Sequence, residues 1–129
     1  MKLSAINDEG VEFELLDPFF RALLPAFAQR AEQIRIEPDD SGVRICYDSK
    51  CSSAPFDSSL HNYGAIAFSR ILILSAMSIA LEGSEQAGRF RVRYDQQVVP
   101  IDVAARRDAS AWYLIFRPAW GTRRVRWRS

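Results

Sequence analysis

The chain is poor in the residues on which metal-dependent and disulfide-dependent small domains rely. Its 129 residues include two cysteines and one histidine. Cys46 and Cys51 stand without a second Cys or His pair, so the sequence supports no zinc site, and in a reducing compartment we expect both thiols to stay free. A chain of this length buries roughly two thirds of its unfolded surface, so one core holds it together without metal or disulfide links. We expect no cofactor.

Long apolar runs are absent as well. No segment approaches the roughly 18 consecutive apolar residues that span a bilayer, and the N-terminal sequence MKLSAINDE lacks the apolar core of a signal peptide. With 48% hydrophobic and 26% charged residues, the composition is that of a soluble globular protein. We therefore expect a cytoplasmic protein without a transmembrane segment.

Lysine is scarce, and the basic charge is carried by arginine. Lys2 and Lys50 are the only lysines, and the formal net charge is +1. This near balance hides a polarity, because residues 1–40 hold nine acidic residues whereas the last 44 residues hold ten arginines against three aspartates. The C-terminal part is thus a candidate for contact with phosphate, an acidic protein or nucleic acid. The charge pattern does not choose among these partners.

The spacing of apolar residues predicts two helices and five strands. Asp17 and Pro18 favour a helix start, and the helical pattern that follows to residue 28 is kinked or split at Pro25. Alternation on both sides of the turn 38–42 predicts a hairpin, and residues 49–57 have the composition of a loop. A long apolar helix, buried around most of its girth, is expected from residue 58 or 59 to about Leu81. Alternation over 89–94 and 98–105 predicts a second hairpin, and the bulky run 111–116 predicts a central strand.

This order of elements indicates the fold class. Hairpin turns this short join antiparallel neighbours, so we predict an α+β two-layer sandwich, an antiparallel sheet with helices packed on one face. No internal repeat or linker rich in Gly and Ser divides the chain. We predict a single domain over residues 1–129, with an acidic leader at 1–16, the sandwich at 17–117 and a basic tail rich in Arg and Trp at 118–129.

Three segments stand out by their order and spacing: residues 31–38 (AEQIRIEP), residues 70–80 (RILILSAMSIA) and residues 86–92 (QAGRFRV). They resemble the segments ASDIHIEP, RIKILSGMDIA and QDGRFRV of the type II secretion and type IV pilus assembly ATPase family. They occur in the family's order and at nearly its spacing, and the similarity covers about residues 19–117. In that family the region is the domain before the motor core, a PAS-like sandwich, so the resemblance implies a PAS-like fold here.

The catalytic part of that family has no counterpart in this chain. The motor core carries a Gly-rich phosphate loop, GxxxxGK followed by Ser or Thr, whose backbone N–H groups and lysine hold the phosphates. Neither Lys2 nor Lys50 lies in such a loop, so we expect no ATP hydrolysis by the chain alone. The resemblance implies a noncatalytic interaction or assembly module that docks on a secretion or pilus ATPase or on an inner-membrane platform protein.

In the family, arginines of this domain reach nucleotide held by a motor core, a role that suits the planar guanidinium. Arg89 and Arg91 match the arginines of QDGRFRV, and Arg44 matches the first arginine of the family's RxRxRIDG strand. Cys46 and Asp48 stand at the next two arginine positions of that strand. The resemblance thus implies a nucleotide or anion contact in trans at Arg44, Arg89 and Arg91, in a domain kept mainly for shape and docking.

Other basic residues are candidates for a partner contact. Arg93 continues the row of Arg89 and Arg91 along one strand face, and such a row is either a solvated outer face or a contact with an anionic partner. The basic tail adds four candidate partner-binding residues: Arg123, Arg124, Arg126 and Trp127. This tail is disordered or docked on the protein itself, binds a protein, or binds nucleic acid or anionic lipid.

Two other functions stay open. PAS-like sandwiches often hold small molecules between helix and sheet, which makes a sensor domain the main alternative. Five aromatic residues either line such a cavity or fill it: Phe56, Tyr63, Phe68, Trp112 and Phe116. Nucleic-acid binding through the basic tail is a further alternative. The single histidine, His61, has no acid or nucleophile fixed near it, and no GxSxG elbow occurs, so we predict no catalytic residue.

Overall fold

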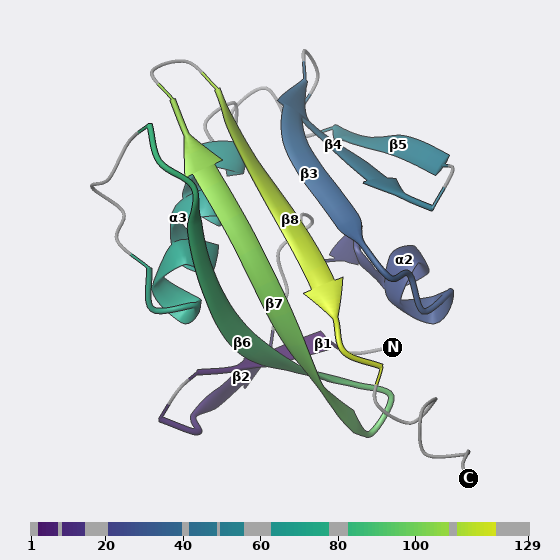
Figure 1. Ribbon diagram of the computed structural model, residues 1–129. Helices are drawn as coiled ribbons and strands as arrows, with labels where there is room; N and C mark the ends of the chain where they lie inside the picture. The colour runs from purple at the N-terminus through teal and green to yellow at the C-terminus, as the bar shows by residue number, and fades with distance from the viewer. Residues whose placement is uncertain are drawn as a thin grey trace, which may run out of the picture.

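The computed structural model describes residues 3–7, 9–14, 21–39, 42–48, 50–55, 63–77, 83–108 and 111–120. These residues form an eight-stranded antiparallel sheet with two helices on one of its faces (Figure 1). The order across the sheet is β2-β1-β6-β7-β8-β3-β4-β5. The elements are β1 (Leu3–Ile6), β2 (Glu12–Glu14), α2 (Leu24–Ala28), β3 (Ile34–Asp39), β4 (Gly42–Tyr47), β5 (Lys50–Pro55), α3 (Tyr63–Leu74), β6 (Gln86–Tyr94), β7 (Gln97–Arg107) and β8 (Trp112–Pro118). The predicted α+β class, with helices on one face of an antiparallel sheet, is confirmed.

The predicted hairpins form where apolar and polar residues alternate. In β3, Ile34 and Ile36 are buried while Arg35 is exposed, and Ile36 lies opposite Ile45 of β4. Both strands run closer to the turn than expected, since Asp39 already pairs with Gly42. One buried face and a short connection fix this register, because a slip of one residue would turn every isoleucine to solvent.

The second hairpin is also confirmed, and its turn has two residues with positive φ. Asp95 and Gln96, at φ of 51° and 64°, connect β6 to β7. Two left-handed residues in succession give a connection whose twist matches that of the flanking strands. β8 returns between β7 and β3, which confirms the prediction of a central strand.

The prediction of a loop over residues 49–57 is wrong, because Lys50–Pro55 forms the strand β5. Of the strands that the structure describes, β5 is the last in the sheet and pairs with β4 alone. An edge strand tolerates polar residues and a terminal proline, since one side needs no partner in the ladder. Its composition, KCSSAP, therefore lacked the alternation by which the other strands were predicted.

The expectation of two free thiols is also wrong. Cys46 of β4 and Cys51 of β5 lie directly opposite each other and form a disulfide. The expectation rested on an assumed reducing compartment, and β5 was not predicted, so nothing in the sequence placed the two sulfur atoms side by side. The pairing of β4 with β5 does so, because opposite positions in an antiparallel pair bring Cβ atoms to roughly 5 Å.

Pro25 lies in the first turn of α2, and the helical pattern is split just before it, as predicted. Arg21 is helical, a turn follows, and α2 then begins with Pro25 in its first turn, where the missing N–H leaves no hydrogen bond unmade. The helix ends with Arg30 at φ 53°, while Ala31 N donates to Ala26 O at 3.0 Å. The predicted start at Asp17 and Pro18 lies outside the described residues.

The helix α3 ends earlier than the predicted residue 81. It stops at Leu74, and Ala76 follows with φ 59°, so that Met77 N donates to Leu72 O at 2.8 Å. This left-handed closure is normally marked by glycine, and its absence hid the helix end from sequence analysis. The expected burial around the girth is incomplete as well, because Ile73 is 66% exposed. Residues 56–62 lie outside the described part, so the predicted start is not addressed.

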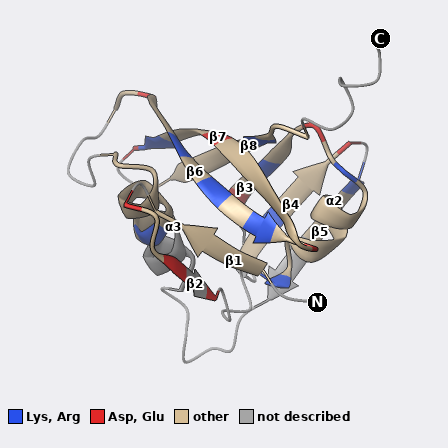
Figure 2. Cartoon of the chain, turned by 90° about the horizontal axis from the view of Figure 1, so that it is seen from below, with Lys and Arg blue, Asp and Glu red and all other residues tan. Residues whose placement is uncertain are grey.

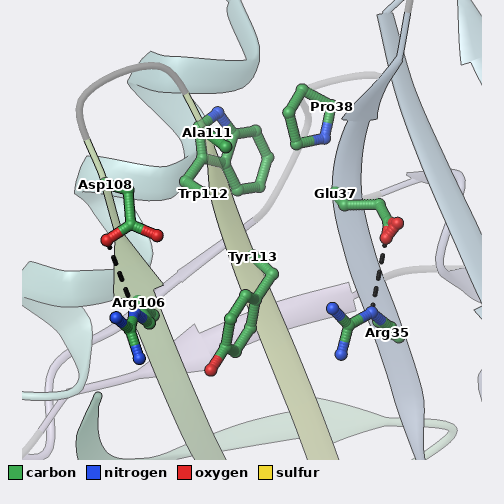
Figure 3. Close-up of a pocket in the computed structure, with 8 residues that line it drawn as sticks. All are labelled: Arg35, Glu37, Pro38, Arg106, Asp108, Ala111, Trp112 and Tyr113. Atoms are coloured by element: carbon green, nitrogen blue, oxygen red, sulfur yellow. Dashed lines mark hydrogen bonds and ion pairs between the residues drawn. The ribbon is translucent and has the colours of Figure 1, made fainter. Parts of the chain in front are cut away.

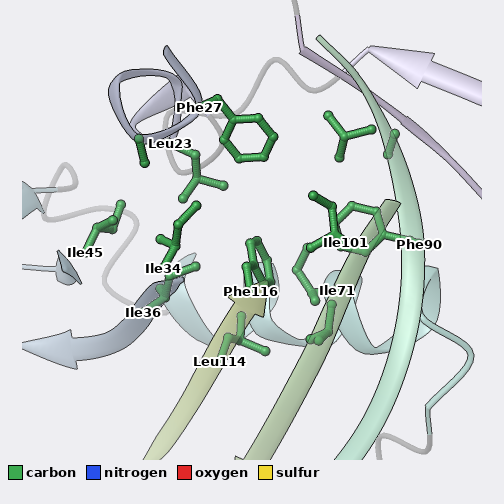
Figure 4. Packing of buried hydrophobic residues seen from close by; sticks show 14 of the residues in the cluster. Leu23, Phe27, Ile34, Ile36, Ile45, Ile71, Phe90, Ile101, Leu114 and Phe116 are labelled. Atoms are coloured by element: carbon green, nitrogen blue, oxygen red, sulfur yellow. The ribbon is translucent and has the colours of Figure 1, made fainter. Parts of the chain in front are cut away.

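The core fills the space between the helices and the inner face of the sheet (Figure 4). Phe27 of α2 and Ile71 of α3 belong to the same buried cluster as Phe90, Ile101 and Phe116 of the strands. The fully buried strand residues sit at alternate positions, which leaves the opposite sheet face to polar side chains. Among the described residues, no helix has the length and apolar character to cross a membrane.

Both ends of the described chain join this sandwich. Residues 3–6 and 12–14, inside the predicted acidic leader, form β1 and β2, and Leu3 and Ala5 are buried. At the other end, Trp120 was assigned to the basic tail, yet it is 2% exposed and donates its indole N–H to Ala31 O at 2.9 Å. The packed unit therefore extends beyond the predicted limits of residues 17 and 117.

Candidate functional site

The sheet has an open face, opposite the helices, that carries most of the described arginines. None of the described elements covers it, and charged residues alternate along β6 in Figure 2. Arg89, Arg91 and Arg93 are all exposed there, between the buried Phe90 and Val92. The prediction that these three arginines share one strand face is confirmed. Seven residues define this open face: Arg35, Arg44, Arg89, Arg91, Arg93, Tyr113 and Arg117.

Acidic residues of neighbouring strands partly neutralise this row. Arg89 Nε donates to Asp102 Oδ1 at 2.7 Å, and Arg93 Nε lies 3.1 Å from Glu12 Oε1. The hydrogen bond to Asp102, together with its charge, raises the pKa of Arg89 above its ordinary value. Because both pairs are about half exposed, water screens them, and each adds little to folding stability. Such pairs can exchange an internal partner for an external one at small cost.

Two arginines of the open face have no acidic partner among the described residues. Arg91 Nη2 donates to the backbone oxygen of Asn7 at 3.3 Å, which leaves its charge uncompensated. Arg117 is exposed and makes no hydrogen bond or ion pair within the described ranges. It stands in the register row Arg89–Asp102–Arg117, so one carboxylate lies between two guanidinium groups. We call Arg89, Arg91 and Arg117 the arginine cluster; its net charge with Asp102 is +2.

The predicted site residues do not include Arg117. A signal was available, because Tyr113, Ile115 and Arg117 alternate with the buried Leu114 and Phe116. What the sequence could not supply was the order of strands. Only the pairing of β7 with β8 brings Arg117 beside Asp102 and hence toward β6.

The structure does not bring Arg44 to Arg89 and Arg91. Arg44 lies on β4, and the strands β7, β8 and β3 separate it from β6. Four strand spacings amount to roughly 19 Å across the sheet. Arg44 Nη2 instead contacts Glu37 Oε1 at 3.4 Å. The predicted common site of Arg44, Arg89 and Arg91 is therefore two separate places on the open face. Arg123, Arg124, Arg126 and Trp127 of the predicted partner site lie outside the described residues.

A shallow pocket of about 230 Å³ indents the open face around Tyr113 (Figure 3). The Arg35 guanidinium lies over the Tyr113 ring at 4.7 Å from its centroid, and Arg106 stands on the other side of the ring. Arg35 contacts Glu37 at 3.3 Å and Arg106 contacts Asp108 at 3.5 Å. Two arginines and two carboxylates cancel, so this pocket has no charge by which to select an anion.

The tyrosine of this pocket is engaged through its hydroxyl. Tyr113 Oη donates to Glu85 Oε2 at 2.6 Å. This hydrogen bond, with smaller contributions from burial and from the Glu85 charge, raises the pKa of Tyr113 above its ordinary value. A phenol with a raised pKa stays protonated near neutral pH, so it is a poor general base there.

The aromatic residues proposed to line a ligand cavity pack on one another where they are described. Phe68 is 2% exposed and its ring centroid lies 5.0 Å from that of Trp112. Phe116 is 1% exposed and meets Phe90 edge to face at 5.8 Å. These residues fill the space between α3 and the sheet. Phe56 and the side chain of Tyr63 lie outside the described part, as does His61.

The described residues hold no cluster of three or more His, Cys, Asp or Glu that could bind a metal ion. No protein-family model matches this chain, and no curated protein matches it.

Proposed function

We propose that this protein is a noncatalytic interaction module, similar to the pre-motor domain of type II secretion and type IV pilus assembly ATPases. It docks on such a motor, or on its inner-membrane platform, through the open face. The observation that carries the proposal is the arginine cluster, where three exposed arginines lie near one carboxylate, Asp102, which contacts Arg89 alone among the described residues. Exposed guanidinium groups on a preformed sheet match carboxylate or phosphate groups of a partner with little loss of conformational freedom.

The three segments that resemble the ATPase family occupy connected places in the fold. Residues 31–38 lead into β3, residues 70–77 form the second half of α3 and its closing turn, and residues 86–92 lie in β6. The last two segments touch at Gly88, where an added Cβ would lie 2.9 Å from Ser75 Cβ and 3.1 Å from Met77 Cγ. The glycine in QAGRFRV is thus required by the approach of the α3 turn, which supports a shared fold rather than a chance likeness.

The strand order supports a PAS-like sandwich. The five strands β4-β3-β8-β7-β6 form a hairpin, then α3, then three antiparallel strands, of which the last returns beside the first strand of the hairpin. This arrangement, with helices on one face, is compatible with the PAS-like fold that the resemblance implies. The strands β5 at one edge and β1 and β2 at the other extend it.

Binding to a purified type II secretion or pilus assembly ATPase tests the proposal, with sedimentation velocity to detect the complex and ATP turnover to detect modulation. We expect association at tens of micromolar or tighter, weakening as salt is added. The triple variant Arg89→Glu, Arg91→Glu, Arg117→Glu should weaken binding by at least about tenfold, because each reversal adds repulsion to the loss of an attractive charge.

A charge-matched variant provides the control. Arg21→Glu, Arg30→Glu, Arg70→Glu changes the net charge by the same amount at exposed sites in or beside the helices, outside the open face. It should bind nearly as well as the natural sequence. An equal loss of binding affinity in both variants would mean that net charge alone, and not the arginine cluster, accounts for the effect. No association with either kind of ATPase would contradict the proposed function. ATP hydrolysis by the chain alone would contradict its noncatalytic part.

A further inference from the structure

The strand β5 is held at the edge of the sheet by few interactions. Among the described strands it pairs with β4 alone. Lys50, Cys51 and Ser52 are all exposed, so these side chains add no apolar burial. Among the described contacts, the strand is held by its ladder with β4, by the Cys46–Cys51 disulfide and by a hydrogen bond of 3.5 Å from Lys50 Nζ to Gln29 Oε1. Segments with little buried surface are the first to open in a native protein.

The disulfide is open to solvent on the same side as the open face. Cys51 is exposed, and Cys46 is half-buried on the wall of a surface depression of about 440 Å³. Arg35, directly opposite Cys46 in the β3–β4 register, lines the same depression together with Glu32 and Asp48. An attacking thiolate needs such access to a sulfur atom, which a disulfide in the core would deny.

We propose that Cys46 and Cys51 form a thiol–disulfide exchange site whose substrate is a dithiol reductant and whose state controls the order of β5. A thiolate of the reductant attacks Sγ of Cys51, an exposed residue, the Cys46–Cys51 bond breaks, and Cys46 leaves as a thiolate.

The second thiolate of the reductant then completes the exchange. It attacks the reductant sulfur of the mixed disulfide, and Cys51 leaves as a thiolate. The reductant is oxidised by two electrons to its own disulfide, and the cystine is reduced by the same two electrons. The two protons lost by the reductant thiols end on Cys46 and Cys51 through solvent. No other oxidant or reductant is required.

Reduction removes the covalent closure of a short hairpin. For a loop of six residues the chain-entropy relation gives a change of roughly 40-fold in the equilibrium between closed and open hairpin. Because β5 pairs with no other strand in the described ranges, this change should stay local. The central strands β7 and β8 should keep their order in the reduced protein.

Alkylation with mass detection and hydrogen exchange on the full chain test this proposal. Without reductant, we expect no thiol to react with iodoacetamide. With dithiothreitol, both cysteines should react under conditions in which circular dichroism still reports a folded protein. Amide exchange over residues 50–55 should accelerate by about 10-fold to 40-fold, while exchange over β7 and β8 stays unchanged.

The double variant Cys46→Ser, Cys51→Ser is the matched control, since it should show the fast exchange of β5 with or without dithiothreitol. If this variant fails to fold, the reduced natural protein alone carries the comparison. Two thiols reactive from the outset would overturn the proposal, as would cysteines that react only on global unfolding. Reduction without faster exchange over residues 50–55 would also overturn it.

Discussion

Ala76 adopts the left-handed conformation that closes α3. Its φ is 59°, it is exposed, and its N–H donates to Ile73 O at 3.1 Å. The Cβ of a non-glycine residue is crowded in this conformation, which costs roughly 1–2 kcal/mol. Glycine removes this cost, but its greater conformational freedom in the unfolded chain offsets part of the gain in stability. The similar segment of the ATPase family has glycine at this position. We expect Ala76→Gly to raise the free energy of unfolding in urea by about 0.5–1 kcal/mol.

The same alanine-to-glycine substitution at a position with a helical backbone is the control. It distinguishes relief of the left-handed conformation from a general effect of glycine on stability. Ala28 is exposed at the end of α2, and Ala28→Gly should lower the free energy of unfolding by about 0.5–1 kcal/mol. Opposite signs at the two positions are the expected result. Destabilisation by Ala76→Gly would show that the left-handed backbone costs the alanine nothing.

At the scale of elements, strands with one buried face could be predicted and those without one could not. Ile34 and Ile36 marked β3, whereas β5 has no such alternation, and its polar residues suit an edge. Helix limits failed for a related reason, because Ala76 carries out the closure that glycine usually signals. The periodicity of apolar residues indicates burial. The edge strand β5 and the end of α3 are instead defined by strand pairing and by backbone conformation.

A hydrogen bond that links two elements on the open face gives a prediction of how folding stability depends on pH. The Tyr113 hydroxyl of β8 reaches Glu85, just before β6, across the intervening β7. This hydrogen bond is the main cause that raises the pKa of Tyr113 above its ordinary value of 10.0, followed by burial and the Glu85 charge. The folded protein thus binds this proton more tightly than the unfolded chain, so its stabilising effect is complete below about pH 10 and is lost as pH rises through the folded pKa.

NMR of the Tyr113 ring carbon that carries the hydroxyl, recorded as a function of pH, measures the pKa of this group and so tests the hydrogen bond. We expect a pKa above 10.0, and a lower one in Glu85→Ala, where the acceptor and its charge are gone. Glu14→Ala serves as the control, since Glu14 lies on the edge strand β2. An unchanged Tyr113 pKa in Glu85→Ala would contradict the assigned cause.

At the scale of the whole molecule, the sequence predicts the arginine row on one strand but not which arginines of other strands lie beside it. Arg89 and Arg91 share a face because they alternate along one strand, a relation that needs no tertiary information. Arg44 and Arg117 depend on which strands pair, and β3 meets β8 from far along the chain. The β3–β8 pairing places β7, β8 and β3 between Arg44 and β6, while the pairing of β7 with β8 brings Arg117 opposite Asp102. Local rules do not encode such long-range contacts.

Trp120 joins distant parts of this assembly. Its indole N–H donates to Ala31 O at 2.9 Å, and its ring meets Phe27 of α2 edge to face at 5.7 Å. The preceding Ala119 N donates to Pro100 O of β7 at 2.8 Å. Trp120 thus joins the chain after β8 to α2 and Ala31, and Ala119 joins it to the central sheet, so Trp120 tests how far the fold depends on residues beyond 117.

Two substitutions of Trp120 should lower the free energy of unfolding by different amounts. Trp120→Phe keeps most of the apolar contact but leaves the buried Ala31 carbonyl without this donor, at a cost of about 1–2 kcal/mol in the free energy of unfolding. Trp120→Ala also opens a cavity and should cost about 3–5 kcal/mol. Trp112→Phe is the matched control, because Trp112 is half-buried and its indole N–H has no hydrogen bond to any described residue. If urea denaturation gives equal losses for Trp120→Phe and Trp112→Phe, the hydrogen bond to Ala31 does not stabilise the fold, and Trp120 acts through its ring alone.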